Sequence, residues 1–146
     1  LIVAFSGGKN PFIDRSFLIT CNGLMLVVLG ISVFSIVERD EAPGMQIIDK
    51  INLALVVVTI LIDAIALSAI LFRIASFGFT PNRVAVLGAN LAVIVHLGMI
   101  CGAYIGFLRQ RTGFAAMRQA VGSYLPVYAA WAAAVAFLLP VIFRFV

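Results

Sequence analysis

The stretch that decides the fold runs from Ile51 to Leu108 and holds two apolar runs, INLALVVVTILIDAIALSAILF (residues 51–72) and VAVLGANLAVIVHLGMICGAYIGFL (residues 84–108). A helix needs about 20 apolar residues to cross the hydrocarbon core of a bilayer, and each run is long enough. The segment between them includes Gly-Phe-Thr-Pro (residues 78–81), in which glycine can end one helix and threonine-proline can begin the next. We therefore expect two antiparallel membrane-spanning helices joined by a tight turn.

The composition of the whole chain also indicates a lipid environment. Of the 146 residues, 64% are hydrophobic and 11% are charged, whereas soluble domains average about 45–50% apolar and about 25% charged residues. The mean hydropathy is +1.18. The sequence predicts an all-α polytopic transmembrane bundle that forms a single domain over residues 1–146. Its four spanning helices are expected at about residues 11–37, 50–75, 81–108 and 125–143.

The charged residues lie mainly in the connecting segments. Residues 38–50 are acidic and are expected to be fully exposed to water, with Asp49 capping the helix that follows. Residues 109–124 place apolar side chains at helical spacing and predict a short amphipathic helix at the membrane interface; the alternative is a basic, flexible linker. Positive charges divide five against five between the two sides, so the sequence does not decide the orientation.

The start of the chain and its charge pattern bear on its partners. The chain opens without Met on Leu1-Ile-Val-Ala-Phe5, a sequence typical of the last turn of an earlier helix. We therefore expect a segment of a longer protein, or a start removed by processing. No basic stripe runs through polar surface, so nucleic acid is not an expected partner. The expected partners are the lipid bilayer and either other membrane subunits or the rest of a longer chain.

Two ionisable residues, Asp63 and His96, lie near the middle of the two central helices. Charge at membrane depth is costly, so such residues are candidates for a role in function. Counted from Arg73 and Arg83 at the turn, both lie roughly 15–20 Å from the same interface. We predict a contact between them. It would serve either as a proton relay, because a carboxylate and an imidazole exchange a proton near neutral pH, or as a hydrogen bond that only fixes packing.

Small and polar residues in the spans predict how the helices pack. Gly98, Gly102 and Gly106 recur every four residues on the face opposite His96, and such small-residue steps allow helices to approach closely. This pattern predicts packing on both sides of the third helix. Further polar candidates are the side chains of Asn22, Asn90 and Thr59, either as hydrogen bonds between helices or as substrate contacts.

Three residues are candidates for the membrane interface. Arg73 and Arg83 flank the central turn, and we expect them to extend toward lipid phosphates; the alternative is a structured loop that docks a partner or a lipid headgroup. Trp131, with Tyr124 and Tyr128, lies near the start of the last helix, where an interfacial aromatic belt is expected.

No motif for a metal, a phosphate or a catalytic triad is present in the sequence. Cys21 and Cys101 lie inside apolar runs and are expected to be small core residues, not metal ligands. No catalytic residue, metal or cofactor is predicted. Because histidine is the usual axial ligand of haem, His96 leaves a haem-binding anchor as a weaker alternative.

Residues 73–90, RIASFGFTPNRVAVLGAN, resemble a segment of a bacterial family of large multi-pass membrane proteins, which is known only as a domain of unknown function. Residues 124–131, YLPVYAAW, are similar to the same family. The resemblance covers most of the chain as the C-terminal part of a longer protein. It implies a helical protein of the bacterial inner membrane and carries no activity or catalytic residues to this chain.

Three functional hypotheses follow from the sequence. The first is a structural or accessory membrane subunit with no catalytic activity of its own. The second is a proton-coupled transporter or an energy-transducing membrane subunit that uses Asp63 and His96. The third and weaker one is a haem- or quinone-binding membrane anchor.

Overall fold

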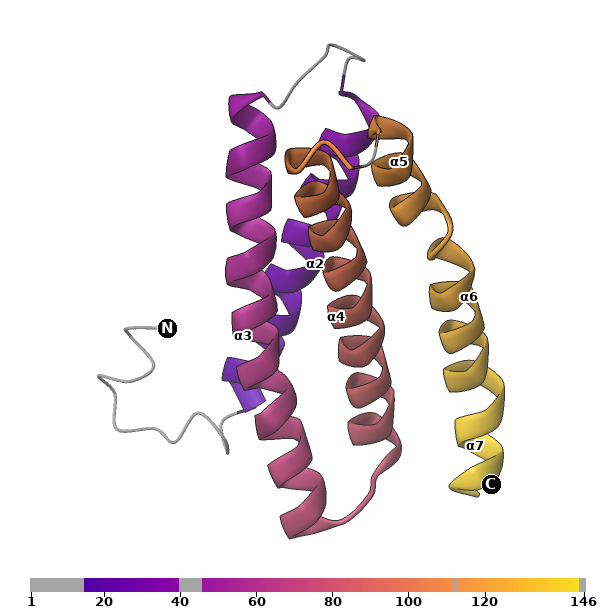
Figure 1. Ribbon diagram of the computed structural model, residues 1–146. Helices are drawn as coiled ribbons and strands as arrows, with labels where there is room; N and C mark the ends of the chain where they lie inside the picture. Colours follow the sequence, from indigo (N-terminus) through magenta and orange to yellow (C-terminus); the bar gives the residue numbers. More distant parts are fainter. Residues whose placement is uncertain (1–14, 40–45, 112, 145–146) are drawn as a thin grey trace, which may run out of the picture.

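The computed structural model describes residues 15–39, 46–111 and 113–144, and within them all regular structure is helical. The long helices are α2 (Arg15–Val37), α3 (Ile47–Phe77) and α4 (Pro81–Leu108). A last segment follows, made of α5 (Phe114–Gly122), α6 (Leu125–Ala133), the π-helical turn η1 (Ala134–Leu138) and α7 (Leu139–Ile142) (Figure 1).

Four helical segments among the described residues are long and apolar enough to cross a membrane. This confirms the predicted all-α bundle with four spans. The predicted bounds hold for α4, whereas α3 is longer at both ends than predicted. The start of the first predicted helix, at residues 11–14, and the expected earlier helix turn at Leu1–Phe5 lie outside the described residues.

The last span, Phe114–Ile142, begins earlier than the predicted helix at residues 125–143 because α5 leads into it. The turn η1 lies just before Pro140. Proline lacks an N–H donor, and its ring displaces the carbonyl of the preceding turn, so the local change to π geometry is a physical consequence of this residue.

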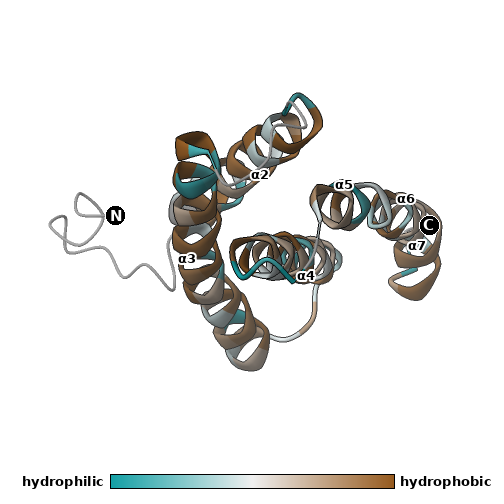
Figure 2. Ribbon diagram, turned by 45° about the horizontal axis from the view of Figure 1, so that its top comes forward, coloured by the Kyte–Doolittle hydropathy of each residue, from teal (hydrophilic) through white to brown (hydrophobic). Residues whose placement is uncertain are grey.

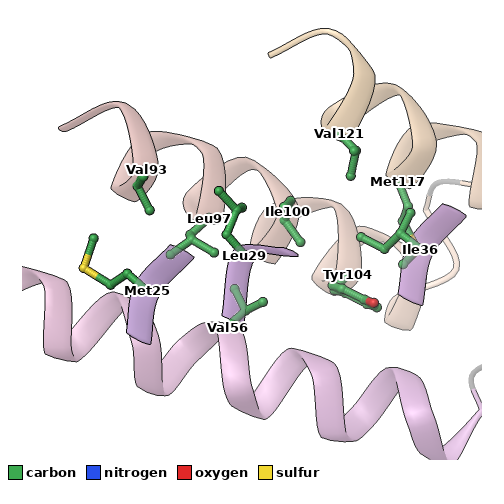
Figure 3. Close-up of a cluster of buried hydrophobic side chains, with 10 residues drawn as sticks. All are labelled: Met25, Leu29, Ile36, Val56, Val93, Leu97, Ile100, Tyr104, Met117 and Val121. Carbon is green, nitrogen blue, oxygen red and sulfur yellow. The ribbon is translucent and has the colours of Figure 1, made fainter. Parts of the chain in front are cut away.

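Helix α4 lies at the centre of the arrangement and contacts α2, α3, α5 and α6. Figure 2 shows α4 between the α2–α3 pair and the segment from α5 to α7. One face of α4 enters the main core at helical spacing. Figure 3 shows the core side chains converging from α2, α3, α4 and α5: Met25, Leu29, Ile36, Val56, Val93, Leu97, Ile100, Tyr104, Met117 and Val121.

The turn between α3 and α4 forms as the sequence predicts. Gly78 has a positive φ of 76°, and Thr80 caps α4 by accepting a hydrogen bond from the main-chain N–H of Arg83 at 3.4 Å. The Arg83 guanidinium in turn donates to the carbonyls of Phe77 (2.9 Å) and Gly78 (2.7 Å). These carbonyls at the end of α3 lack partners within the helix, so Arg83 stabilises the turn.

The start of α3 is held by a buried ion pair. Arg39 donates from Nε to both carboxyl oxygens of Asp49, at 2.9 and 3.0 Å, and its guanidinium lies over the rings of Phe107 and Phe114. Asp49 also accepts from the main-chain N–H of Gln46 at 2.8 Å. It therefore stabilises the start of α3 as predicted, but from the third helical position, because Gln46 is the N-cap residue. The prediction that residues 38–50 are fully exposed to water is wrong for Arg39 and Asp49, whose side chains are each 2% exposed. These two side chains can be buried because they pair with each other, and the pairing satisfies both charges inside the protein.

The predicted amphipathic helix forms as α5. Its apolar residues Met117 and Val121 lie in the core, whereas Arg118 and Gln119 are exposed. This excludes the flexible-linker alternative for Phe114–Gly122.

The outer surface of the bundle is apolar. Many large hydrophobic side chains are exposed. Hydrophobic colour predominates along most of the helices in Figure 2. α6 and η1 contain no buried residue. A surface of this kind requires lipid or other apolar partners, so the chain is a multi-pass membrane protein.

Candidate functional site

Asp63 lies on the buried face of α3 and is fully enclosed, with 0% exposure. Neither of its carboxyl oxygens has a hydrogen-bond partner among the described residues. The Cys21 thiol of α2 is close enough to interact electrostatically with this carboxyl. The side chain therefore belongs to the α2–α3 side of the bundle.

His96 lies on α4 and is also buried. Its Nδ1 is 3.0 Å from the Tyr128 hydroxyl, and the tautomer of the ring decides which of the two donates. The imidazole stacks on the ring of Tyr124, with centroids 4.7 Å apart, and the main chain of Ala120 also lies near it. Nε2 has no hydrogen-bond partner in the described part of the chain.

The predicted contact between Asp63 and His96 includes no hydrogen bond. Among the described residues neither carboxyl oxygen of Asp63 has a partner, and His96 Nδ1 bonds the Tyr128 hydroxyl. The reason is rotation about the α4 axis. Leu97 enters the core shared with α3, and one residue along a helix turns the side chain by about 100°. His96 therefore faces α5 and α6, and the two ionisable groups form two separate centres.

The secondary polar candidates divide between two roles. Asn90 of α4 donates from Nδ2 to Asn22 Oδ1 of α2 at 3.1 Å, so this pair links two helices as predicted. Thr59 donates to the carbonyl of Leu55, at 2.8 Å, within its own helix. Within the described part of the chain, Thr59 therefore makes no hydrogen bond to another helix.

A buried hydrogen-bond network that the sequence did not single out connects α2, α3 and α4. Ser32 donates to Asn52 Oδ1 at 3.0 Å, and Asn52 donates from Nδ2 to the Tyr104 hydroxyl at 2.6 Å. The available signal was the position of Asn52 on the same helical stripe as Asp63. Ser32 and Tyr104 lie in apolar runs whose sequence gives no sign of their partners.

Two of the three glycines in the ladder, Gly98 and Gly102, do not pack within the described chain. An added Cβ at Gly98 or Gly102 would meet no other atom within 4 Å, and both residues are exposed; Gly106 is half-buried. The close approach occurs at Gly88 instead, where a Cβ would collide with the indole ring of Trp131. The sides of α4 that pack are those against α2, α3, α5 and α6, and the Gly98 face stays open.

Trp131 is packed against α4. Besides its contact with Gly88, its indole Nε1 donates to the carbonyl of Ala85 at 3.3 Å. Tyr124 and Tyr128, expected in the same interfacial belt, instead surround His96 inside the bundle.

The arrangement supplies two enclosed ionisable groups with unused hydrogen-bonding capacity, Asp63 and His96. No group of three or more potential metal ligands is found among the described residues. No family model, curated protein or solved structure matches this chain. The family resemblance and the haem or quinone alternative therefore stay predictions.

Proposed function

We propose that this chain is a membrane-embedded unit of a proton-coupled transporter or energy-transducing complex, and that Asp63 is its proton-binding carboxyl. One observation carries the proposal. Asp63 is completely enclosed in a membrane-spanning helix, and neither of its carboxyl oxygens has a hydrogen-bond partner among the described residues.

The energetics favour a functional over a packing role for Asp63. A polar group buried without a hydrogen bond costs about 1–3 kcal/mol in proteins, and an ionised carboxylate at the centre of a membrane costs about 2.5–3.5 kcal/mol or more. A side chain that serves packing recovers this cost through a bond to a neighbouring helix, as Asn22 and Asn90 do. Asp63 makes no such bond to any residue that the structure describes, so the cost of burying it calls for another explanation.

A series of polar side chains lies along the buried face of α3, between the start of the helix and Asp63. Asp49, Asn52 and Thr59 lie on the same buried face of α3, over about 21 Å of helix between Asp49 and Asp63. Val56 interrupts the series, so no continuous hydrogen-bonded chain connects the polar residues. A proton that reaches Asp63 from this side needs water to enter beside Val56.

Proton flux across vesicles tests the proposal. The protein is reconstituted with a pH-sensitive dye inside, and a potassium diffusion potential drives protons inward. We expect uptake by the wild type and by Asp63→Glu, which keeps the carboxyl, and none by Asp63→Asn. Ser68→Ala changes an exposed residue of the same helix and should leave the flux unchanged. Equal flux in wild-type and Asp63→Asn vesicles would contradict the proposal.

A structural or accessory subunit is the second candidate, and the open face of α4 favours it. Gly98 and Gly102 meet nothing within the described chain, and α6 buries no residue. Helices of another subunit, or of a longer chain, would pack closely on such small residues. Purification in mild detergent with mass spectrometry of co-purifying chains tests this role. We expect a stoichiometric membrane partner that Gly98→Leu releases; a protein that purifies alone would contradict it.

A further inference from the structure

A pocket of about 280 Å³ lies beside the α3–α4 turn, where these two helices meet α2. Two cations, Arg73 near the end of α3 and Arg83 at the start of α4, line it together with the polar side chains of Thr80 and Asn82. Both arginines are half-buried. The pocket is therefore a confined cationic site and not a freely exposed charge.

These arginines have no acidic partner in the described part of the chain. The ion pair found there, Arg39–Asp49, lies at the opposite end of the bundle from the turn (Figure 1). Arg83 is also oriented, because its Nη1 is held by the carbonyls of Phe77 and Gly78. An oriented guanidinium beside a second arginine suits an anion with several oxygens, because guanidinium groups bind phosphate through paired hydrogen bonds.

The pocket lies at the level of lipid headgroups. The turn joins the ends of two membrane-spanning helices, so its arginines are expected at the boundary between hydrocarbon and water. Basic residues at this level attract anionic lipids.

An apolar groove of about 450 Å³ adjoins the pocket, between α2, α4 and the last span. Asn22 and Val86 line both spaces, so the two lie side by side. The polar groups of the groove are already engaged: the side chains of Asn22 and Asn90 bond each other, and the indole N–H of Trp131 bonds a carbonyl. The rest of its lining is hydrophobic, which favours a hydrocarbon chain over a polar ligand.

We propose that the Arg73–Arg83 pocket binds the phosphate of an anionic phospholipid, one of whose acyl chains lies in the adjoining groove against Trp131. A cationic pocket beside an apolar groove matches the order of headgroup and chain in a phospholipid. The site is separate from Asp63, and lipid binding neither requires nor implies proton transfer there.

Quenching of Trp131 by brominated lipids tests the proposal, because Trp131 is the only tryptophan in the chain. The full protein is reconstituted in bilayers that mix phosphatidylglycerol and phosphatidylcholine, with bromine on the acyl chains of one lipid at a time. We expect brominated phosphatidylglycerol to quench at a lower fraction, with a preference on the order of ten-fold, because two cations act on its headgroup. Equal quenching by the two lipids would overturn the proposal.

Variants separate this pocket from general surface charge. Arg73→Gln should remove most of the preference, whereas the matched control Arg109→Gln, an exposed arginine at the other end of α4, should keep it. Arg73 is chosen because Arg83 also stabilises the turn. Unchanged emission of Trp131 in unbrominated lipid verifies the fold. A preference that survives Arg73→Gln, or that disappears equally in Arg109→Gln, would overturn the assignment.

Two further measurements test the source of the phosphate and the groove. Inorganic phosphate at millimolar concentration should leave the lipid preference intact; its loss would mean that the pocket takes free phosphate and would overturn the lipid proposal. Ala132→Phe places a ring in the groove and should weaken quenching by both lipids. Quenching that is unaffected by this ring would contradict the placement of the acyl chain.

Discussion

Replacing Arg39 with alanine would leave the Asp49 carboxylate buried without its cation. The carboxylate would keep the main-chain N–H of Gln46 but lose its hydrogen bonds and ion pair with the guanidinium. Removing one partner of a buried ion pair costs about 3–5 kcal/mol, because the remaining charge stays desolvated. For a chain of this size, 1 kcal/mol corresponds to about 2–4 °C, so we expect the melting temperature to fall on the order of 10 °C.

The two cysteines supply the assay for this prediction. Cys21 is buried and Cys101 is half-buried, so a thiol-reactive dye reports unfolding when the protein is heated in mild detergent. Arg109→Ala is the matched control, because Arg109 is exposed and its loss should change stability by at most about 0.5 kcal/mol. If Arg39→Ala and Arg109→Ala melt at the same temperature, the reasoning about the buried pair is refuted.

A double replacement distinguishes the loss of one charged partner from the loss of the whole ion pair. Arg39→Met combined with Asp49→Leu leaves no uncompensated charge, and pairs replaced in this way are often as stable as the original. We therefore expect the double variant to melt well above Arg39→Ala.

Two further predictions concern helix packing. Gly88→Ala brings a methyl group against the indole of Trp131 and should separate α6 from α4, which raises the quenching of Trp131 by acrylamide; Gly98→Ala, in open space on the same helix, should not change it. Equal quenching in the two variants would contradict the packing described. Tyr104→Phe leaves the Asn52 amide without its acceptor and should cost about 1–3 kcal/mol in the same melting assay, and an unchanged melting temperature would count against the network.

Features that depend on neighbouring residues in the chain were predictable from the sequence. The four spans follow from the length of the apolar runs. The turn follows from Gly78 and Thr80, and Asp49 lies in the first turn of α3. Each of these depends on local backbone chemistry, so composition and spacing were sufficient.

The directions in which the helices face were not predictable in the same way. Counting residues placed Asp63 and His96 at similar depth, but the rotation of α4 depends on the packing of α5 and α6 against it. Gly98 belongs to the four-residue glycine repeat that predicts close helix packing, but no other helix covers it in the described chain. Gly88 lies outside this repeat and makes the close contact, with Trp131. Such choices depend on contacts between segments far apart in the sequence.

Burial of charge was also misjudged from the sequence. Arg39 and Asp49 lie in a short acidic segment, which is normally exposed to water. Their burial depends on the tertiary fold, which places the rings of Phe107 and Phe114 against the Arg39 guanidinium. The stripe of polar residues on α3 that leads toward Asp63 was the one available sign of a buried polar path.

Labelling with dicyclohexylcarbodiimide tests most directly whether Asp63 binds a proton inside the membrane. This apolar reagent reacts with protonated carboxyl groups in hydrocarbon surroundings, and mass spectrometry of the digested protein locates the adduct without any assumption about the substrate. We predict an adduct on Asp63 that diminishes as the pH is raised and is absent in Asp63→Asn, and none on the ion-paired Asp49. Absence of an adduct on Asp63 at every pH, or an adduct whose yield does not depend on pH, would contradict the proposed role.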